Sequence, residues 1–141
     1  MDYGACGMVS RNKLIPAAEN KRKFTLRNSS EKIVTKVKVD GCLKLEGKRC
    51  DYLFEIDQPT SKVIYLELKG GDTEEALKQL VATLGHFNQQ HQSCEKVLCI
   101  VAASNSPQFG TALQHKKAEL RKLKVKAENV KRFTNQGQLD I

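Results

Sequence analysis

Two apolar segments joined by a short turn occupy residues 50–70, and this pattern constrains the fold more than any other part of the chain. The turn, at residues 58–62, contains a proline and interrupts strand pairing. The pattern therefore predicts an antiparallel β-hairpin. Asp51 begins its first strand, whereas Glu67 and Lys69 end the second. Charged side chains are costly to place in so apolar a setting, which makes these three residues candidates for a functional site.

Further strands are predicted on both sides of the hairpin. Residues 32–40 alternate between apolar and basic side chains, as expected for a half-buried strand with a basic outer face. A turn signal at Asp40-Gly41 predicts a short return strand at 42–45. The run KVLCIVAA at 96–103 is continuously apolar, which is typical of a fully buried strand. The tail, 125–141, predicts one or two short edge strands.

Helices are expected in three places. The longest is predicted from about Thr73 to Gln90, because Asp72 followed by Glu75 forms a capping-box pattern. Its apolar residues recur at spacings of three and four, and its buried face is predicted to contain Leu77, Leu80, Val81, Leu84 and Phe87. A second helix, rich in Lys and Arg, is expected at 111–123. A third and shorter helix is expected at 16–19, where Pro16 occupies a tolerated first-turn position.

This order of elements predicts an α/β fold. An antiparallel meander that feeds a crossover helix and a further central strand favours a three-layer sandwich with a central mixed β-sheet. With 141 residues the chain is expected to form a single domain. We place its core at about 33–103, between a basic N-terminal segment at 1–32 and a basic C-terminal helix and strands at 104–141.

Positive charge is concentrated at the two ends of the chain. Residues 1–50 carry 12 Lys and Arg against 5 Asp and Glu, and residues 96–141 carry 9 against 3. Residues 51–95 are acidic, with 3 Lys and Arg against 8 Asp and Glu. Basic flanks beside an acidic centre would bind a polyanion while the acidic centre holds a cation. A solvated basic surface is the alternative explanation.

The sequence also restricts location and cofactor chemistry. No apolar run approaches the roughly 18 residues of a membrane span, and no secretory signal is evident, so we expect an intracellular, cytoplasmic protein without membrane association. The five cysteines include no CxxC pair, and we expect them to be reduced and structural. The three histidines are not spaced along the chain like the ligands of a metal ion, and we expect them to be solvated.

The hairpin ends have the chemistry of a metal site. If the turn is centred near residue 60, paired residue numbers sum to about 120, which places Asp51 opposite Lys69 and close to Glu67. Mg²⁺ prefers hard oxygen ligands, and carboxylates from Asp51 and Glu67, with the backbone carbonyl of Leu68, would supply them. We expect Mn²⁺ to substitute. Such a metal polarises a phosphate and activates water, and Lys69 would orient that water and stabilise developing charge.

The tripeptide Glu-x-Lys alone is not diagnostic, because it also occurs at 19–21 and 46–48. The third copy differs in its surroundings. It lies in an apolar hairpin that also contains an aspartate expected to lie opposite it, and it is followed by two glycines and an amphipathic helix. A purely structural interpretation, in which Glu67 and Lys69 form an edge-strand salt bridge, stays open.

The combination of Asp51, Glu67-Leu68-Lys69 and a following helix resembles the PD-(D/E)XK nuclease superfamily. This group includes restriction endonucleases, Holliday-junction resolvases and recombination nucleases. The resemblance covers about residues 33–103 and implies a restriction-endonuclease-like core. It also implies that Asp51 and Glu67 bind metal and that Lys69 is the catalytic lysine. Cys50 stands where the proline of the family motif would be.

The resemblance also suggests accessory residues. Many members place a glutamate on a helix before the first core strand, and Glu19 and Glu31 are the candidates here. Some members carry a glutamine on the helix after the lysine, and Gln79 matches it. The family pattern has a tyrosine one helical turn after this glutamine, and this chain has Thr83 there instead.

Together these features predict a Mg²⁺-dependent nuclease that hydrolyses phosphodiester bonds of DNA, with RNA left open as a substrate. Because little lies beyond the core, we expect weak sequence specificity and reliance on a homodimer or a partner subunit. Contacts with DNA are expected from basic residues of the flanks, namely Lys36, Lys38, Lys116, Lys117 and Arg121. Two alternatives stay open: a catalytically inactive nucleic-acid-binding or assembly module of the same fold, and an unrelated α/β interaction domain.

Overall fold

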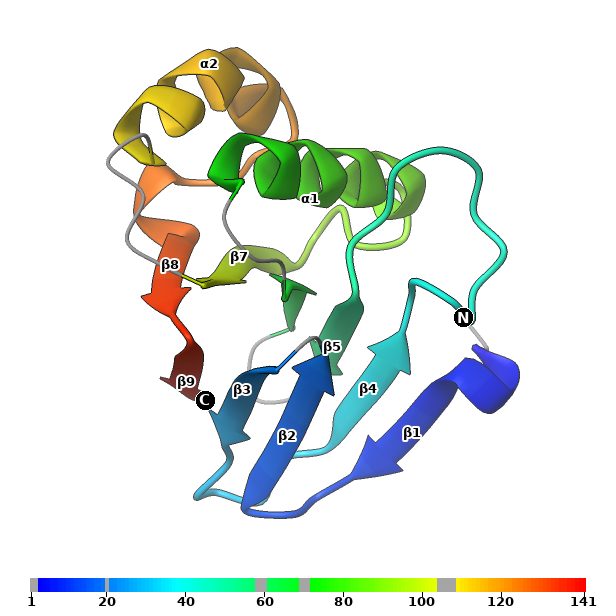
Figure 1. The fold of residues 1–141 in the computed structure, drawn as a ribbon. Helices are drawn as coiled ribbons and strands as arrows, with labels where there is room; N and C mark the ends of the chain where they lie inside the picture. Colours follow the sequence, from blue (N-terminus) through cyan, green and yellow to red (C-terminus); the bar gives the residue numbers. More distant parts are fainter. Residues whose placement is uncertain (1–2, 20, 58–60, 69–71, 104–108) are drawn as a thin grey trace.

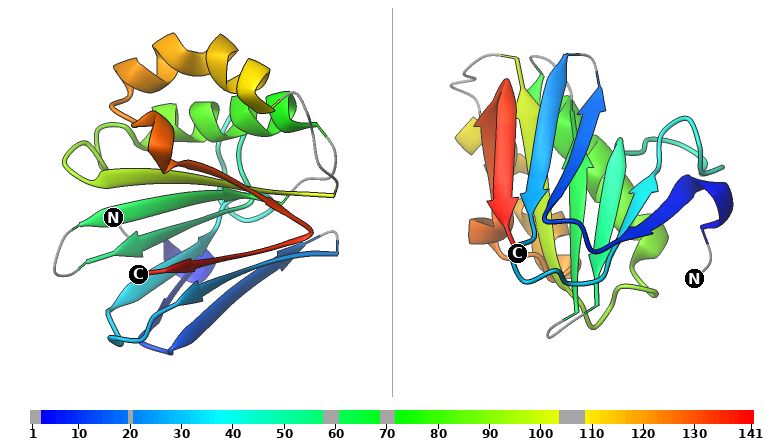
Figure 2. Two further views of the ribbon diagram at one scale, coloured as in Figure 1. Left: turned by 90° about the vertical axis from the view of Figure 1, so that its left-hand side faces the viewer. Right: turned by 90° about the horizontal axis from the view of Figure 1, so that it is seen from below.

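Helices and two β-sheets form three stacked layers in the computed structural model (Figures 1 and 2). The structure describes residues 3–19, 21–57, 61–68, 72–103 and 109–141. Within these residues a six-stranded sheet lies between a layer of two α-helices and a three-stranded sheet. The predicted mixed α/β fold with a central mixed sheet is therefore confirmed.

The central sheet is built around the predicted hairpin. In spatial order it contains β1 (Gly7–Ser10), β4 (Val34–Lys38), β5 (Tyr52–Ile56), β6 (Lys62–Glu67), β7 (Glu95–Ala102) and β8 (Val130–Thr134). The pairs from β1 to β6 are antiparallel, whereas β6, β7 and β8 are parallel to one another. The predicted meander, crossover helix and further central strand are thus all present.

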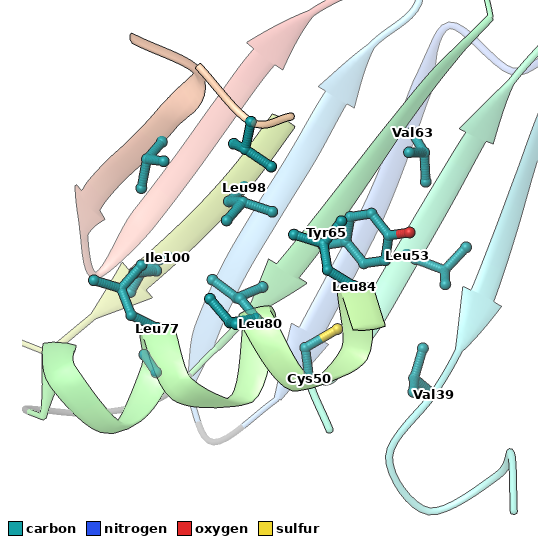
Figure 3. Packing of buried hydrophobic residues seen from close by; sticks show 14 of the residues in the cluster. Val39, Cys50, Leu53, Val63, Tyr65, Leu77, Leu80, Leu84, Leu98 and Ile100 are labelled. Atoms are coloured by element: carbon teal, nitrogen blue, oxygen red, sulfur yellow. The ribbon is translucent and has the colours of Figure 1, made fainter. Parts of the chain in front are cut away.

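The two helices cover one face of the central sheet. Helix α1 (Thr73–Phe87) begins where predicted, and the Asp72 side chain accepts a hydrogen bond from the Glu75 amide at 3.1 Å. All five residues expected on its apolar face are buried. They pack on strand residues such as Tyr65 and Leu98 (Figure 3). Helix α2 (Phe109–Lys122) packs against α1 and buries little besides Ala112 and Leu120.

The smaller sheet covers the other face and was not expected. It contains β2 (Leu14–Glu19), β3 (Arg22–Arg27) and β9 (Gln136–Asp140) in that order. Apolar residues of this sheet, including Phe24 and Leu26, pack on Phe54, Ile64 and Leu66 of the central sheet. The hairpin is apolar on both faces, so both faces need cover.

The short helix predicted at 16–19 is wrong. The segment is strand β2, in which Ile15 and Ala17 are buried while Leu14 and Pro16 are exposed. This period of two is that of a strand. Pro16 is tolerated because β2 is an edge strand, where a missing amide hydrogen leaves no neighbour unpaired.

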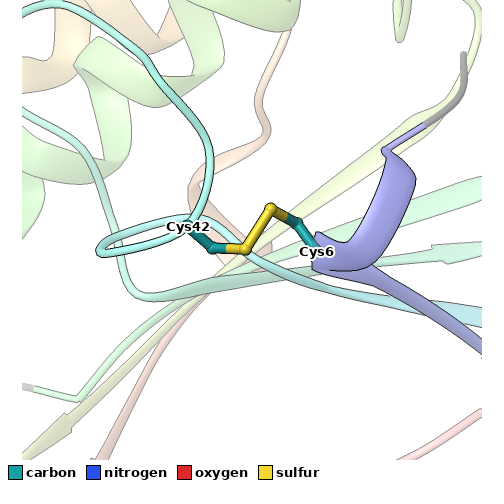
Figure 4. Close-up of a disulfide and its surroundings, with 2 residues drawn as sticks. All are labelled: Cys6 and Cys42. Carbon is teal, nitrogen blue, oxygen red and sulfur yellow. A yellow bond between two sulfur atoms is a disulfide. The ribbon is translucent and has the colours of Figure 1, made fainter.

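The return strand predicted at 42–45 is also wrong, because that segment is turn and irregular structure. It is instead held by a disulfide between Cys42 and Cys6, whose Cα atoms lie 5.7 Å apart (Figure 4). Cys6 ends the 3₁₀ helix η1 (Gly4–Cys6). The expectation of reduced cysteines is therefore wrong for this pair and right for Cys50, Cys94 and Cys99, which are free.

The C-terminal tail forms the two edge strands that were predicted. After the 3₁₀ helix η2 (Ala127–Asn129), β8 ends the central sheet and β9 ends the smaller one, each parallel to its neighbour. Among the helices in the described ranges, none combines the length and the apolar character needed to cross a membrane.

Candidate functional site

The hairpin register differs from the predicted one by two residues. Tyr52 pairs with Leu66, so paired numbers sum to 118, and the Asp51 amide donates to the Leu66 carbonyl at 3.1 Å. Carried one residue further, this register places Asp51 beside Glu67. Lys69 itself lies outside the described residues.

Asp51 and Glu67 form a buried carboxyl pair, the feature around which the site is built. Their exposed fractions are 5% and 0%, and their side chains are hydrogen bonded to each other. One Asp51 oxygen, Oδ2, also accepts from the Leu68 amide at 2.7 Å, which orients the carboxyl group. The Leu68 amide thus holds the Asp51 carboxyl group in place beside Glu67.

The electrostatics of Asp51 agree with this geometry. Burial raises its pKa, the Leu68 amide and the hydrogen bond with Glu67 oppose that shift, and the negative charges of Glu19 and Asp40 add to it. Loss of hydration disfavours the charged form of a carboxyl group, and neighbouring carboxylates act in the same direction. A divalent cation would reverse both effects, because it replaces the lost hydration and neutralises the repulsion.

Glu19 approaches the pair from the other sheet. It ends β2, and its charge is close enough to Asp51 to raise the pKa of that residue. Its Oε1 lies 3.7 Å from Nζ of Lys38, while its Oε2 is buried without a hydrogen-bond partner among the described residues. Glu19, one of the two candidates for an accessory glutamate, is therefore near the site, although on a strand instead of a helix.

The other two accessory candidates are placed differently. Glu31 precedes β4 at the end where Val34 pairs with Ile56, which is the opposite end of the hairpin from Asp51. Gln79 lies on α1, and its backbone carbonyl accepts a hydrogen bond from Thr83 Oγ1 at 2.8 Å.

Thr83 is a positioning residue on α1 that the predicted apolar face did not include. It is fully buried, and its Oγ1 accepts a hydrogen bond from the Cys50 amide at 2.7 Å. This contact ties the residue that precedes Asp51 to the helix layer. The signal was available in the sequence, because Thr83 follows Leu80 by three residues and precedes Phe87 by four, on the apolar stripe.

The basic residues expected to contact nucleic acid fall into two groups. Lys36 and Lys38 lie over the ring of Tyr52, with their Nζ atoms 5.2 and 5.4 Å from its centre. Tyr52 directly follows Asp51 of the carboxyl pair. Lys36 Nζ also donates to the Pro16 carbonyl at 2.6 Å. Burial, with repulsion from Lys38 added, lowers the pKa of Lys36.

The remaining three basic residues are on α2, on the other face of the central sheet. Lys116 forms an ion pair with Glu119 at 3.2 Å, whereas Lys117 and Arg121 are exposed. The predicted nucleic-acid contacts are therefore not one continuous surface beside the carboxyl pair.

A second polar cluster lies near the end of β5 that is remote from Asp51. His91, which is 2% exposed, joins the Tyr65 hydroxyl and the Glu55 carboxylate through hydrogen bonds of 2.5 Å on either side. Tyr3 donates to Glu55 at 2.6 Å, and Gln90 donates to both residues. The expectation of solvated histidines is wrong for His91, and Tyr3 of the N-terminal segment is held by the same Glu55 carboxylate that His91 contacts.

The donor set fits Mg²⁺ chemistry. Asp51 and Glu67 provide hard carboxylate oxygens, and Mg²⁺ commonly uses one or two carboxylates together with waters and phosphate oxygens. The buried, unpartnered Oε2 of Glu19 is a further oxygen with unmet hydrogen-bonding capacity. No group of three or more His, Cys, Asp or Glu side chains in the described part of the chain is arranged to hold a metal ion. Among the described side chains, ligation would therefore come mainly from the pair.

Comparisons with protein-family models, with curated proteins and with solved structures find no match for this chain. The resemblance to the PD-(D/E)XK nucleases consequently stays a prediction that depends on the residues themselves. Those residues are Asp51, Glu67 and Lys69, of which the first two are now described as a buried, hydrogen-bonded pair.

Proposed function

We propose that the protein is a Mg²⁺-dependent nuclease that hydrolyses phosphodiester bonds of DNA, built on a restriction-endonuclease-like core. One observation carries the proposal: two buried carboxyl groups, Asp51 and Glu67, are hydrogen bonded at the start and the end of one hairpin. The order of three antiparallel strands, a helix and a parallel strand supports the choice of core.

Each residue of the proposed site has a separate role. Asp51 and Glu67 supply oxygen ligands, and the Leu68 amide keeps Asp51 Oδ2 oriented. Lys69 follows Glu67 by two residues and would assist the attacking water with its ammonium group. Bound Mg²⁺ would polarise the scissile phosphate and lower the pKa of a water molecule. The Leu68 carbonyl is the proposed backbone ligand.

A catalytically inactive nucleic-acid-binding or assembly module is the second candidate. The raised pKa of Asp51 weighs against it. A buried carboxyl group that ionises reluctantly lowers stability at neutral pH, and a module without a cation gains nothing from that arrangement.

The proposal is tested by incubating wild-type protein and variants with supercoiled, linear, single-stranded and branched DNA. Reactions contain Mg²⁺, Mn²⁺ or EDTA. Cleavage should require a metal and should disappear in Asp51→Asn and Lys69→Ala. Glu46→Gln is the matched control, because it alters an exposed Glu-x-Lys copy outside the hairpin. Cleavage that persists in Asp51→Asn, or in EDTA, would contradict the proposal, whereas binding without cleavage would support the inactive module.

Thermal unfolding supplies a second readout that needs no activity. If Mg²⁺ binds with a dissociation constant of about 1 mM, then about 10 mM Mg²⁺ stabilises the native state by roughly 1.4 kcal/mol. Wild type and Glu46→Gln should show this gain, and Asp51→Asn should not. An equal gain in all three proteins would place metal binding away from the carboxyl pair.

A further inference from the structure

A groove between the end of α2 and η2 is lined by basic side chains that the proposed catalytic site does not use. Its volume is about 520 Å³. Lys117, Arg121, Lys124 and Lys126 line it and are all exposed. None of these four side chains forms an ion pair or a hydrogen bond with another part of the described chain. One carboxylate, that of Glu128, also lines the groove, so positive charge prevails.

The floor of the groove is apolar. Buried Leu120 and Val125 line it, together with half-buried Leu113. A cationic rim above an apolar floor suits a ligand with anionic groups on one side and flat apolar surfaces on the other. A single-stranded nucleic acid has this character, because its phosphates are charged and its bases are not enclosed in a duplex. The volume falls in the range of small-ligand pockets, which suits a short stretch of strand.

Lys124 provides an independent observation. Its φ angle is 61°, in the left-handed region, and its amide donates to the Arg121 carbonyl at the point where α2 ends. Glycine is usual at this position, and a lysine there is strained. Attraction between basic residues and the negative end of the helix would explain Arg121 and Lys124 but not Lys126, which lies outside α2 and immediately precedes η2.

The groove is remote from the carboxyl pair. Asn129, the last residue of η2, contacts Glu95 at the start of β7, whereas Glu67 pairs with Ile100 towards the end of that strand. We infer that the groove binds the phosphodiester backbone of a single-stranded nucleic acid segment away from the scissile bond. The inference rests on the proposed function only in the choice of nucleic acid as the polyanion.

Binding is measured by fluorescence anisotropy with a labelled oligothymidylate in EDTA, so that no cleavage occurs. The groove variant combines Lys117→Gln, Arg121→Gln and Lys124→Gly. Glycine at 124 tolerates the positive φ angle, so this change removes a charge without adding strain. The control variant removes the same charge from exposed positions outside the groove, with Lys13→Gln, Lys44→Gln and Lys122→Gln.

We expect the groove variant to bind at least about tenfold more weakly at 0.1 M salt. The slope of the logarithm of the binding constant against the logarithm of salt concentration should become shallower by about 2, because the variant loses three cations and each phosphate contact on a single strand contributes about 0.7 to the slope. The control variant should change affinity by less than about threefold. Equal losses in the two variants would overturn the inference. So would displacement of the oligonucleotide by polyglutamate as readily as by unlabelled DNA, since that result favours an acidic protein partner.

The outcome is separable from that of the nuclease proposal. Asp51→Asn should bind the oligonucleotide like wild type while failing to cleave. A protein that binds through the groove but never cleaves would refute only the proposed activity. A protein that cleaves, and whose groove variant binds normally, would refute only the groove.

Discussion

Replacing Thr83 with valine tests how the helix layer positions the carboxyl pair. The change keeps the branched shape of the side chain and removes one hydroxyl group. That hydroxyl accepts from the Cys50 amide at 2.7 Å and donates to the Gln79 carbonyl at 2.8 Å. Thr83 and Cys50 are both fully buried, so water cannot replace the lost partner. The Gln79 carbonyl is less affected, because it lies within α1 and the helix supplies a backbone donor.

The expected loss follows from the unpaired Cys50 amide. Leaving a buried donor unsatisfied costs roughly 1 to 3 kcal/mol, so we expect Thr83→Val to lower the free energy of unfolding by about 2 kcal/mol. For a domain of this size the urea dependence is about 2 kcal/mol per molar, so the unfolding midpoint should fall by about 1 M. Because Cys50 precedes Asp51, DNA cleavage should fall as well.

Urea unfolding followed by circular dichroism measures the effect. Thr83→Ser is the matched control, since it keeps the hydroxyl and loses one methyl group, at a cost of about 1 kcal/mol. The reasoning is refuted if Thr83→Val unfolds within about 0.5 kcal/mol of wild type, or if the serine variant loses as much stability as the valine variant.

Two further predictions concern the N-terminal half of the fold. Burial acts to raise the pKa of Glu55, but hydrogen bonds from His91 and Tyr3 outweigh it, so the pKa lies below its ordinary value of 4.5. Ionised Glu55 therefore stabilises the native state at pH values above 4.5, and this stabilisation is lost as the pH falls through the depressed pKa of Glu55 in the folded protein. Glu55→Gln should therefore be less stable than wild type at pH 7, with a difference that shrinks below about pH 4.5 in urea titrations; a constant difference would contradict this. Cys42→Ser opens a loop with a sequence separation of 36 and should cost about 2 to 4 kcal/mol of unfolding free energy without reductant. Alkylation of both Cys6 and Cys42 in the unreduced protein would show instead that no disulfide forms.

Local patterns in the sequence predicted most elements of the central layer and its helices. The hairpin and β7 were recognisable because their burial is almost continuous, and α1 because its burial follows a period between three and four residues. The segment at β2 was misread because proline suits both the first turn of a helix and an edge strand. The two-residue error in the hairpin register arose because the turn position, which the sequence leaves loose, sets every pair that follows.

The sequence by itself determined which residues are the candidates for a functional site: two acids and a lysine at the ends of one hairpin, between basic flanks. Only the tertiary structure decided which of them meet. Glu19 lies near Asp51 because two separate sheets pack face to face, and Thr83 holds Cys50 because α1 crosses the hairpin. The four exposed cations around the groove come together because the chain turns sharply after α2. The physical reason is that periodicity reports how each element is buried, whereas contacts between distant segments depend on how the layers pack.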